Sequence, residues 1–172
     1  MSAGKDGTTI GGGGISDRRD RSIRLWGERG QAALERGHVL CLNASVVATE
    51  TLKNLVLPGV GKITIVDNKQ VMTKDLGNNF FLDMECVGQL RGKMVLQNLI
   101  ELNGDVKGEH VAEDPETLVD QKPDYFSSFS CVIATDLPEP CLLKLASILW
   151  DAGIPLFVGR AYGMVMLTRI PP

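Results

Sequence analysis

The sequence HVLCLNASVVATETLKNLVLPGVGKITIVD, residues 38–67, constrains the fold more strongly than any other part of this chain. It reads as an apolar strand, a turn, a helical segment stopped by Pro58-Gly59, a second apolar strand and an acid, Asp67. This order is typical of the first unit of a nucleotide-binding α/β domain, in which the acid can hold ribose hydroxyls. We therefore expect parallel β-strands joined by helices.

The turn after the first strand is NASVVA, residues 43–48, and it contains no glycine. Phosphate-binding turns use glycine because backbone N–H groups must approach the pyrophosphate closely, and a Cβ atom obstructs that approach. Here every residue carries a Cβ atom, and Val46 and Val47 are β-branched. We interpret the segment as a packed structural turn rather than a phosphate-binding loop.

Apolar runs recur along the rest of the chain and alternate with helical patterns. Runs such as ITIV and VIAT are typical of strands buried on both faces, as in a parallel sheet. The alternation predicts a doubly wound, Rossmann-like α/β domain whose sites lie beyond the C-terminal strand ends, near Asn43, Asp67 and Asp136. The strands are expected at Val39–Ala44, Ile63–Val66, Val106–Val111, Cys131–Thr135 and Pro155–Val158.

Glycine and proline residues mark the ends of the expected helices. These helices are expected at Arg18–Arg36, Val46–Leu57 and Val87–Asn103, from Pro115 onward, and at Pro140–Trp150. Residues 1–16 form a Gly-rich flexible tail, and residues 17–172 form one domain. The last apolar run, Tyr162–Ile170, leads straight to the end of the sequence, which is typical of a truncated chain. An ordinary short C-terminus is the alternative.

The composition argues against two classes of partner. A net charge of −3 and a pI near 5.4 give no basic surface for nucleic acid. No apolar run approaches the ~20 residues of a membrane span. The N-terminal residues 1–16 lack the apolar core of a secretion signal. We expect no nucleic-acid or membrane partner, and a location in the cytoplasm, the nucleus or both.

No residue pattern predicts a metal site or a catalytic constellation. The two histidines, His38 and His110, have no Cys or Ser partner in a recognisable arrangement. The cysteines lack the paired spacing of zinc ligands and are interpreted as inert thiols, buried where they lie inside apolar runs. They are Cys41, Cys86, Cys131 and Cys141.

Two acids at expected strand ends have alternative interpretations. Asp67 lies about twenty residues past the turn, as the dinucleotide-binding pattern requires, but a solvated turn residue is the simpler interpretation. Asp136 closes VIATD and suits either a metal ion or the cap of the next helix, ahead of Pro138. We favour the cap.

Arginines crowd the first expected helix, ahead of Trp26. They are Arg18, Arg19, Arg21 and Arg24. Arginine suits bidentate phosphate contacts, including contacts donated across an interface between subunits. A solvated, charged helix is the alternative.

The same segment contains DRSIRLWG, residues 20–27, which resembles the DRQLRLWG signature of eukaryotic activating enzymes for ubiquitin and its relatives, in the ThiF/MoeB superfamily. The likeness runs from about residue 17 to the end and includes TETLKNLVLPGVGKITIVD, DLGNNFFL, VGQLRGKM, PETL, ATDLPEP and GIPLFVGRAYG. The segments LKNLVLPG, GNNFF and ATxLPE are most similar to regulatory subunits of neddylation-activating enzymes, of the amyloid-precursor-protein-binding type.

Several positions depart from the pattern of members that adenylate. Those members carry GxGGxG after the first strand, where this chain has NASVVA, and DxD followed by NLNRQ after the second. Asp67 keeps the first acid, but Lys69 stands at the second and Asn78 at the arginine of NLNRQ. The lysine that follows the VG pair is replaced by Arg91, and only Asp136 remains of a DN pair after the fourth strand. The resemblance thus implies that this chain alone does not activate ATP.

In this superfamily two such folds pair face to face, and a first-helix arginine of one reaches ATP phosphates held by the other. The matching residue is Arg21. The resemblance implies a non-catalytic regulatory subunit of a heterodimeric activating enzyme for a ubiquitin-like modifier. It also implies that the catalytic partner holds ATP, Mg²⁺ and the thioester cysteine, that this chain binds no metal, and that Asp67 and Asp136 are vestigial.

Other functions stay open. The chain is also similar to the small subunit of SUMO-activating enzymes. An enzyme that adenylates alone and a nicotinamide-dependent oxidoreductase are two further alternatives, and both need the glycines that NASVVA lacks. The last alternative is an interaction module in which Arg21 has no chemical role.

Overall fold

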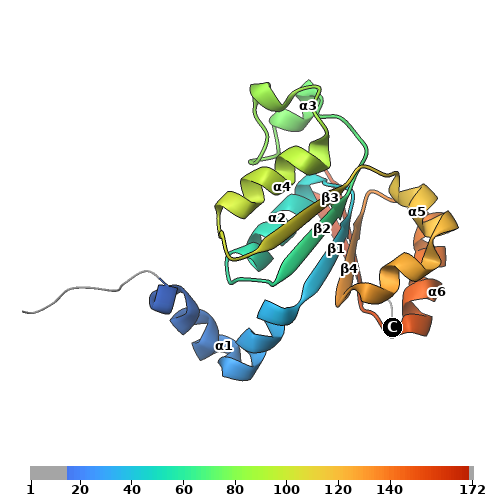
Figure 1. The fold of residues 1–172 in the computed structure, drawn as a ribbon. Coiled ribbons are helices and arrows are strands. Elements are labelled where there is room, and N and C mark those ends of the chain that lie inside the picture. Colours follow the sequence, from blue (N-terminus) through green and yellow to red (C-terminus); the bar gives the residue numbers. More distant parts are fainter. Residues whose placement is uncertain (1–14, 171–172) are drawn as a thin grey trace, which may run out of the picture.

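Six β-strands form one sheet in the order β3-β2-β1-β4-β5-β6, in a computed structural model that describes residues 15–170 (Figure 1). The first five strands are parallel and β6 is antiparallel to β5. The order reverses between β1 and β4, as in a doubly wound fold. The strands are β1 (His38–Leu42), β2 (Lys62–Val66), β3 (Lys107–Val111), β4 (Cys131–Thr135), β5 (Leu156–Tyr162) and β6 (Val165–Arg169).

Helices cover both faces of the sheet and enclose two apolar cores. On one face, α4 (Arg91–Glu101) packs over β2 and β3, and α2 (Val46–Val56) packs beside it over β4 and β5. On the other face lie α5 (Pro115–Gln121), the 3₁₀ helix η2 (Pro123–Ser128) and α6 (Glu139–Ala152). The fold class predicted from the sequence is confirmed.

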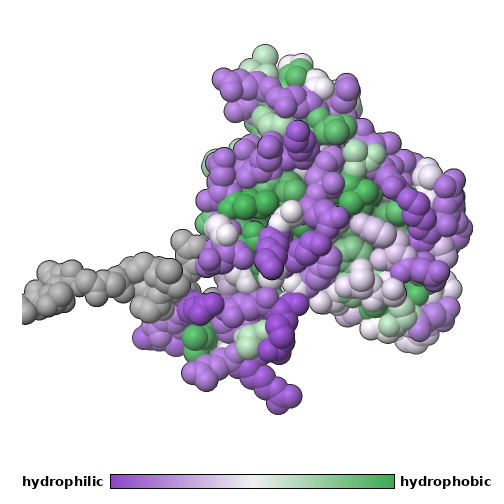
Figure 2. Space-filling view, viewed as in Figure 1, coloured by the Kyte–Doolittle hydropathy of each residue, from purple (hydrophilic) through white to green (hydrophobic). Residues whose placement is uncertain are grey.

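Helix α1 (Ile15–Arg36) is bent and stands apart from the helices that cover the sheet (Figure 1). Its backbone leaves the helical region at Gly27, where φ is 73°. Leu25 and Trp26, just before the bend, are exposed. The helix ends directly before β1 and therefore joins the sheet at the N-terminal edge of its parallel strands. In the space-filling view, α1 is largely hydrophilic, with isolated green side chains (Figure 2).

The segment between β2 and α4 differs from the prediction. A helix was expected from Val87, but α4 begins at Arg91 because the backbone of Gly88 is left-handed, with φ of 82°. The segment instead forms α3 (Thr73–Leu76), the short 3₁₀ helix η1 (Met84–Cys86) and a β-bridge between Gln70 and Leu90. It lies beyond the end of the sheet opposite α1 (Figure 1).

The remaining boundaries follow the local sequence closely. Ser45 caps α2, since its side chain accepts a hydrogen bond from the Ala48 N–H at 3.2 Å. Gly153, with φ of 66°, ends α6 as predicted. The last apolar run is a hairpin that turns at Gly163 into β6. Residues 1–14 of the expected tail lie outside the described residues.

Candidate functional site

The turn between β1 and α2 lies where the strand order reverses, and the side chain of Asn43 links it to the end of β4. Asn43 follows β1 in a left-handed backbone conformation with φ of 64°, which Asn tolerates better than most residues. Its Nδ2 donates to the Thr135 carbonyl at the end of β4, at 2.8 Å. The Thr135 hydroxyl donates back to the Asn43 carbonyl at 3.1 Å. These bonds tie together the two strand ends that would border a ligand.

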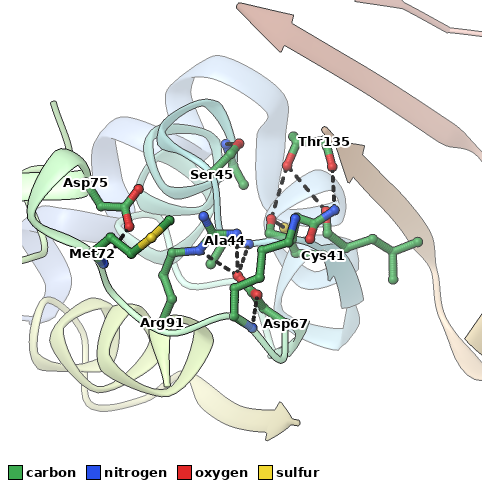
Figure 3. A network of polar contacts seen from close by, with 12 residues as sticks. Cys41, Ala44, Ser45, Asp67, Met72, Asp75, Arg91 and Thr135 are labelled. Carbon is green, nitrogen blue, oxygen red and sulfur yellow. Dashed lines mark hydrogen bonds and ion pairs between the residues drawn. The ribbon is translucent and has the colours of Figure 1, made fainter. Parts of the chain in front are cut away.

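Asp67 lies at the end of β2 and is fully buried. Its carboxylate accepts a hydrogen bond from the Ala44 N–H at 2.9 Å and another from the Lys69 N–H, also at 2.9 Å. The Nε of Arg91 donates to the same carboxylate at 2.8 Å (Figure 3). The carboxylate that was considered for ribose hydroxyls is therefore already occupied by this chain's own donors.

Arg91 is the first residue of α4, and its side chain is nearly buried. Its Nη2 also lies 2.8 Å from Asp67 Oδ2, but without the alignment of a hydrogen bond. The close approach depends on Gly92, where a Cβ atom would meet His110 Cδ2 at 2.8 Å and Asp67 Cβ at 3.0 Å. The ring Nε2 of His110 donates to the Asp67 carbonyl at 2.9 Å. The start of α4, the end of β2 and His110 on β3 are thus in close contact around the Asp67–Arg91 ion pair.

The entrance of α2 is packed rather than open. Val47 lies against β5, where a Cβ atom added to Gly159 would be only 2.8 Å from the Val47 Cγ1. The Ala44 N–H, which a phosphate would need, points at Asp67 instead. A pyrophosphate and a ribose therefore do not fit the residues present at this turn. The geometry agrees with the interpretation of NASVVA as a structural turn.

A family model described as "ThiF family" matches residues 18–165, which is most of the chain. The chain belongs to the ThiF family. Its fold is similar to that of a solved structure, the E. coli tRNA N6-threonylcarbamoyladenosine dehydratase TcdA in complex with AMP, with a TM-score of 0.77. That alignment covers 92% of this chain and 64% of TcdA at 19% identity, which shows the fold alone.

Curated relatives of this ThiF chain are named as regulatory subunits. It is 54% identical over 151 residues to the NEDD8-activating enzyme E1 regulatory subunit of Xenopus laevis, covering 88% of this chain and 28% of the relative. It is 51% identical over 153 residues to the Gallus gallus protein of the same name, covering 89% and 29%. The Arabidopsis thaliana subunit AXR1 is 48% identical over 151 residues, covering 88% and 28%. The chain thus spans under a third of these relatives' length.

Asp136 is not the helix cap that we predicted. The N-cap of α6 is Pro138, and no side chain caps that helix. Asp136 instead follows β4 in a left-handed conformation with φ of 53° and is exposed. Pro138 holds the cap position and α6 begins at Glu139. The Asp136 carboxylate therefore lies two residues too early in the chain to cap the helix. It borders a shallow polar pocket with Glu116 and Arg160.

The structure does not bring Arg21 near these strand ends. Arg21 is exposed on α1, which joins the opposite edge of the sheet. Neighbouring arginines are engaged: Arg24 pairs with Asp20 at 2.7 Å, and Arg19 pairs with Glu35 at 3.1 Å. Within the described residues, Arg21 forms no ion pair.

The four cysteines of this ThiF domain are free thiols with raised pKa values. Burial, followed by the negative charge of Asp67, raises the pKa of Cys41 far above its usual range. Burial also raises the pKa of Cys86 and of Cys131. Residues 15–170 contain no group of three or more His, Cys, Asp or Glu side chains placed to hold a metal ion. In the same residues, no helix has the length and apolar character to cross a membrane.

Arg91 is the site residue whose role sequence reasoning missed. The resemblance placed it where adenylating members carry lysine, but not as the partner of Asp67. An arginine at the start of a helix, 24 positions after an acid that ends a strand, was the available signal. It becomes meaningful only once α4 is known to begin at Arg91 and to lie beside the end of β2.

Proposed function

We propose that the chain is the adenylation-domain-like part of a non-catalytic regulatory subunit, in a heterodimeric activating enzyme for NEDD8. The relatives of that name support the modifier, and the occupied Asp67 carboxylate supports the absence of catalysis by this chain. The Asp67–Arg91 ion pair is the observation that carries the proposal. In it the Arg91 side chain occupies the carboxylate that would otherwise be available to the ribose of a nucleotide.

In this proposal the catalytic partner supplies what this chain lacks. ATP, Mg²⁺ and the thioester-forming cysteine belong to the partner subunit, which also engages the C-terminus of the modifier. The raised pKa values of Cys41 and Cys131 argue against either thiol as an acceptor, since the thiolate is the nucleophile. The enzyme would work in the cytoplasm, the nucleus or both.

Arg21 is the residue of this chain that we propose to act in the chemistry. Its exposed guanidinium, on a helix that stands apart from the sheet, is available to a second subunit. Leu25 and Trp26 add exposed apolar surface beside it. In that position the guanidinium would contact ATP phosphates held by the partner and stabilise their negative charge during adenylation. Arginines donated across an interface contribute about 10³–10⁵ in rate to GTPases.

The test is co-expression with candidate catalytic subunits, followed by a modifier thioester assay. The Arg21→Ala variant should still co-purify with the partner but form thioester at least about 100-fold more slowly. Arg24→Ala is the matched control, because Arg24 is also exposed on the same helix and already pairs with Asp20. It should react at close to the unmodified rate.

The outcomes separate the parts of the proposal. If Arg21→Ala leaves assembly and rate unchanged, the role of Arg21 fails while the regulatory function stands. If no catalytic subunit co-purifies, the regulatory function itself fails. ATP–pyrophosphate exchange by the isolated chain would show instead an enzyme that adenylates alone, and thioester formation with SUMO rather than NEDD8 would assign the other modifier.

A further inference from the structure

Helix α1 consists of two arms that meet at Gly27. The first arm covers residues 15–26 and carries Arg21, and the second arm covers residues 28–36 and leads into β1 (Figure 1). The backbone of Gly27 has φ of 73° and ψ of 169°, a combination that is essentially restricted to glycine. The bend at Gly27 therefore sets the direction in which the first arm points.

The second arm is held against the sheet. The N–H groups of Gly37 and Gly61 both donate to the Leu34 carbonyl, at 2.9 and 3.2 Å. A Cβ atom on Gly61 would overlap the Glu35 carbonyl, so the chain that enters β2 lies directly against this arm. The second arm thus moves with the domain, and the position of Arg21 depends on the bend.

Gln31 connects the first arm both to the second arm and to the domain. It is only 4% exposed. Its Oε1 accepts a hydrogen bond from the Trp26 Nε1–H at 3.2 Å, and this bond crosses the bend. Its Nε2 donates to Glu35 Oε1 at 3.0 Å and to the Pro58 carbonyl at 2.9 Å. The whole amide is therefore engaged, and it links the first arm to the turn between α2 and β2.

The two arms also pack closely beside the bend. A Cβ atom on Gly30 would lie 2.8 Å from Trp26 Cδ1, so the indole ring packs directly on the backbone of the second arm. Ser22, one turn before Trp26, is buried. Arg19 pairs with Glu35 at 3.1 Å, but both side chains are partly exposed, and such pairs contribute little to stability. The buried hydrogen bond is therefore the polar contact that defines the bend.

We propose that Gln31 is a positioning residue for Arg21, an inference that rests on the proposed role of Arg21 in the chemistry. Buried hydrogen bonds add little net stability but depend strongly on direction. Because Gln31 holds Trp26 from a fixed point on the domain, it restricts the bend to one angle. The first arm then presents the Arg21 guanidinium at one place, as contact with the ATP phosphates of a partner subunit requires.

The test compares single and double variants in the heterodimer, by thioester formation at saturating ATP and partner. Gln31→Met keeps the side-chain volume but removes three hydrogen bonds, and it should lower kcat about 10- to 100-fold. In the Arg21→Ala background the same substitution should change kcat less than about twofold, because the residue that Gln31 positions is gone. A purely structural role would slow both proteins by the same factor.

Asn103→Leu is the matched control. Asn103 is another buried amide beside the same turn, and its Nδ2 donates to the Val56 carbonyl at 2.9 Å. Its Oδ1 accepts from the Asp105 N–H at 3.2 Å, so its two hydrogen bonds hold the domain rather than α1. The variant should lose stability, as Gln31→Met does, but keep the unmodified kcat.

Gly27→Ala tests the bend without changing Gln31. Gly27 is exposed, and a Cβ atom there would meet nothing within 4 Å, so the substitution acts through the backbone conformation alone. It should slow the reaction only when Arg21 is present. Circular dichroism checks the fold of each variant, and if Gln31→Met does not fold, Gly27→Ala decides.

The indole N–H resonances of the 172-residue chain report the hydrogen bond itself. The chain has two tryptophans, and Trp150→Phe leaves only Trp26. Gln31→Met should then move the remaining resonance upfield, as the loss of a hydrogen bond does.

The outcomes separate this inference from the proposed function. A Trp26 resonance that Gln31→Met leaves in place would overturn the inference, as would equal slowing with and without Arg21, or slowing by Asn103→Leu. If Arg21→Ala slows the reaction and Gln31→Met does not, the inference fails while the proposed function stands. If Arg21→Ala has no effect, the proposed role of Arg21 fails, and this inference with it.

Discussion

Arg91 and Asp67 form an ion pair that is almost closed off from solvent, with side-chain exposures of 12% and 0%. The pair joins the start of α4 to the end of β2, and the Ala44 N–H adds the turn before α2 to the same carboxylate. Three elements thus meet at one acid. Buried charges are costly to transfer from water, so the pair stabilises the fold little in itself, but removing one member leaves the other charge uncompensated.

Arg91→Ala should therefore lower the free energy of unfolding by about 3–5 kcal/mol, measured by urea denaturation. Lys122→Ala is the control, because Lys122 pairs with Glu113 at a similar 2.8 Å but on the exposed surface. Exposed pairs contribute about 0–1 kcal/mol, so the control should lose no more than that. Equal losses in the two variants would contradict a special role for the buried pair.

Gly92→Ala should destabilise the protein by about 1–3 kcal/mol, although alanine favours helices over glycine. The added Cβ atom would meet His110 and Asp67 at 3.0 Å or less, and neither can withdraw without breaking its own hydrogen bonds. Gly77→Ala is the comparison: Gly77 has φ of −72°, and a Cβ atom there would meet nothing within 4 Å. Thermal unfolding should show no loss for Gly77→Ala, and a gain for Gly92→Ala would disprove the contact argument.

The β1–α2–β2 unit could be predicted because its boundaries are set by local chemistry. Ser45 caps α2 with its own side chain, and Gly59, with φ of 92°, supplies the left-handed residue after the helix. Gly153 ends α6 for the same reason. The apolar runs then identified which strands are buried on both faces.

The misplaced features depend on contacts that sequence spacing does not encode. Gly88 takes a left-handed conformation that delays α4, although the apolar periodicity continues through it. Asp136 precedes a helix and resembles a cap, but Pro138 occupies the cap position. The partner of Asp67 is Arg91 on another element, so it follows only from tertiary structure.

His38 should make stability fall as the pH drops below about 6.5. Burial, and next the positive charge of Lys62, lower the pKa of His38 in the folded protein, while Glu109 opposes them in part. The unfolded chain then binds protons more readily than the folded one, so acid favours unfolding. His38→Gln should show a flatter loss of melting temperature between pH 7 and 5. An identical pH profile for the two proteins would exclude this contribution.

Cys141 should react slowly with iodoacetamide despite its partial exposure. Burial, and then the charges of Glu116, Asp120 and Asp114, raise its pKa to about 11, although Lys144 opposes them. Only the thiolate reacts, so its alkylation rate should rise about tenfold per pH unit from pH 7 to 10. Glu116→Gln should speed the reaction at pH 8, whereas Glu101→Gln, which alters an acid on α4, should not. Mass spectrometry of the digested protein separates Cys141 from the other cysteines, and a rate that levels off near pH 8.5 would contradict the raised pKa.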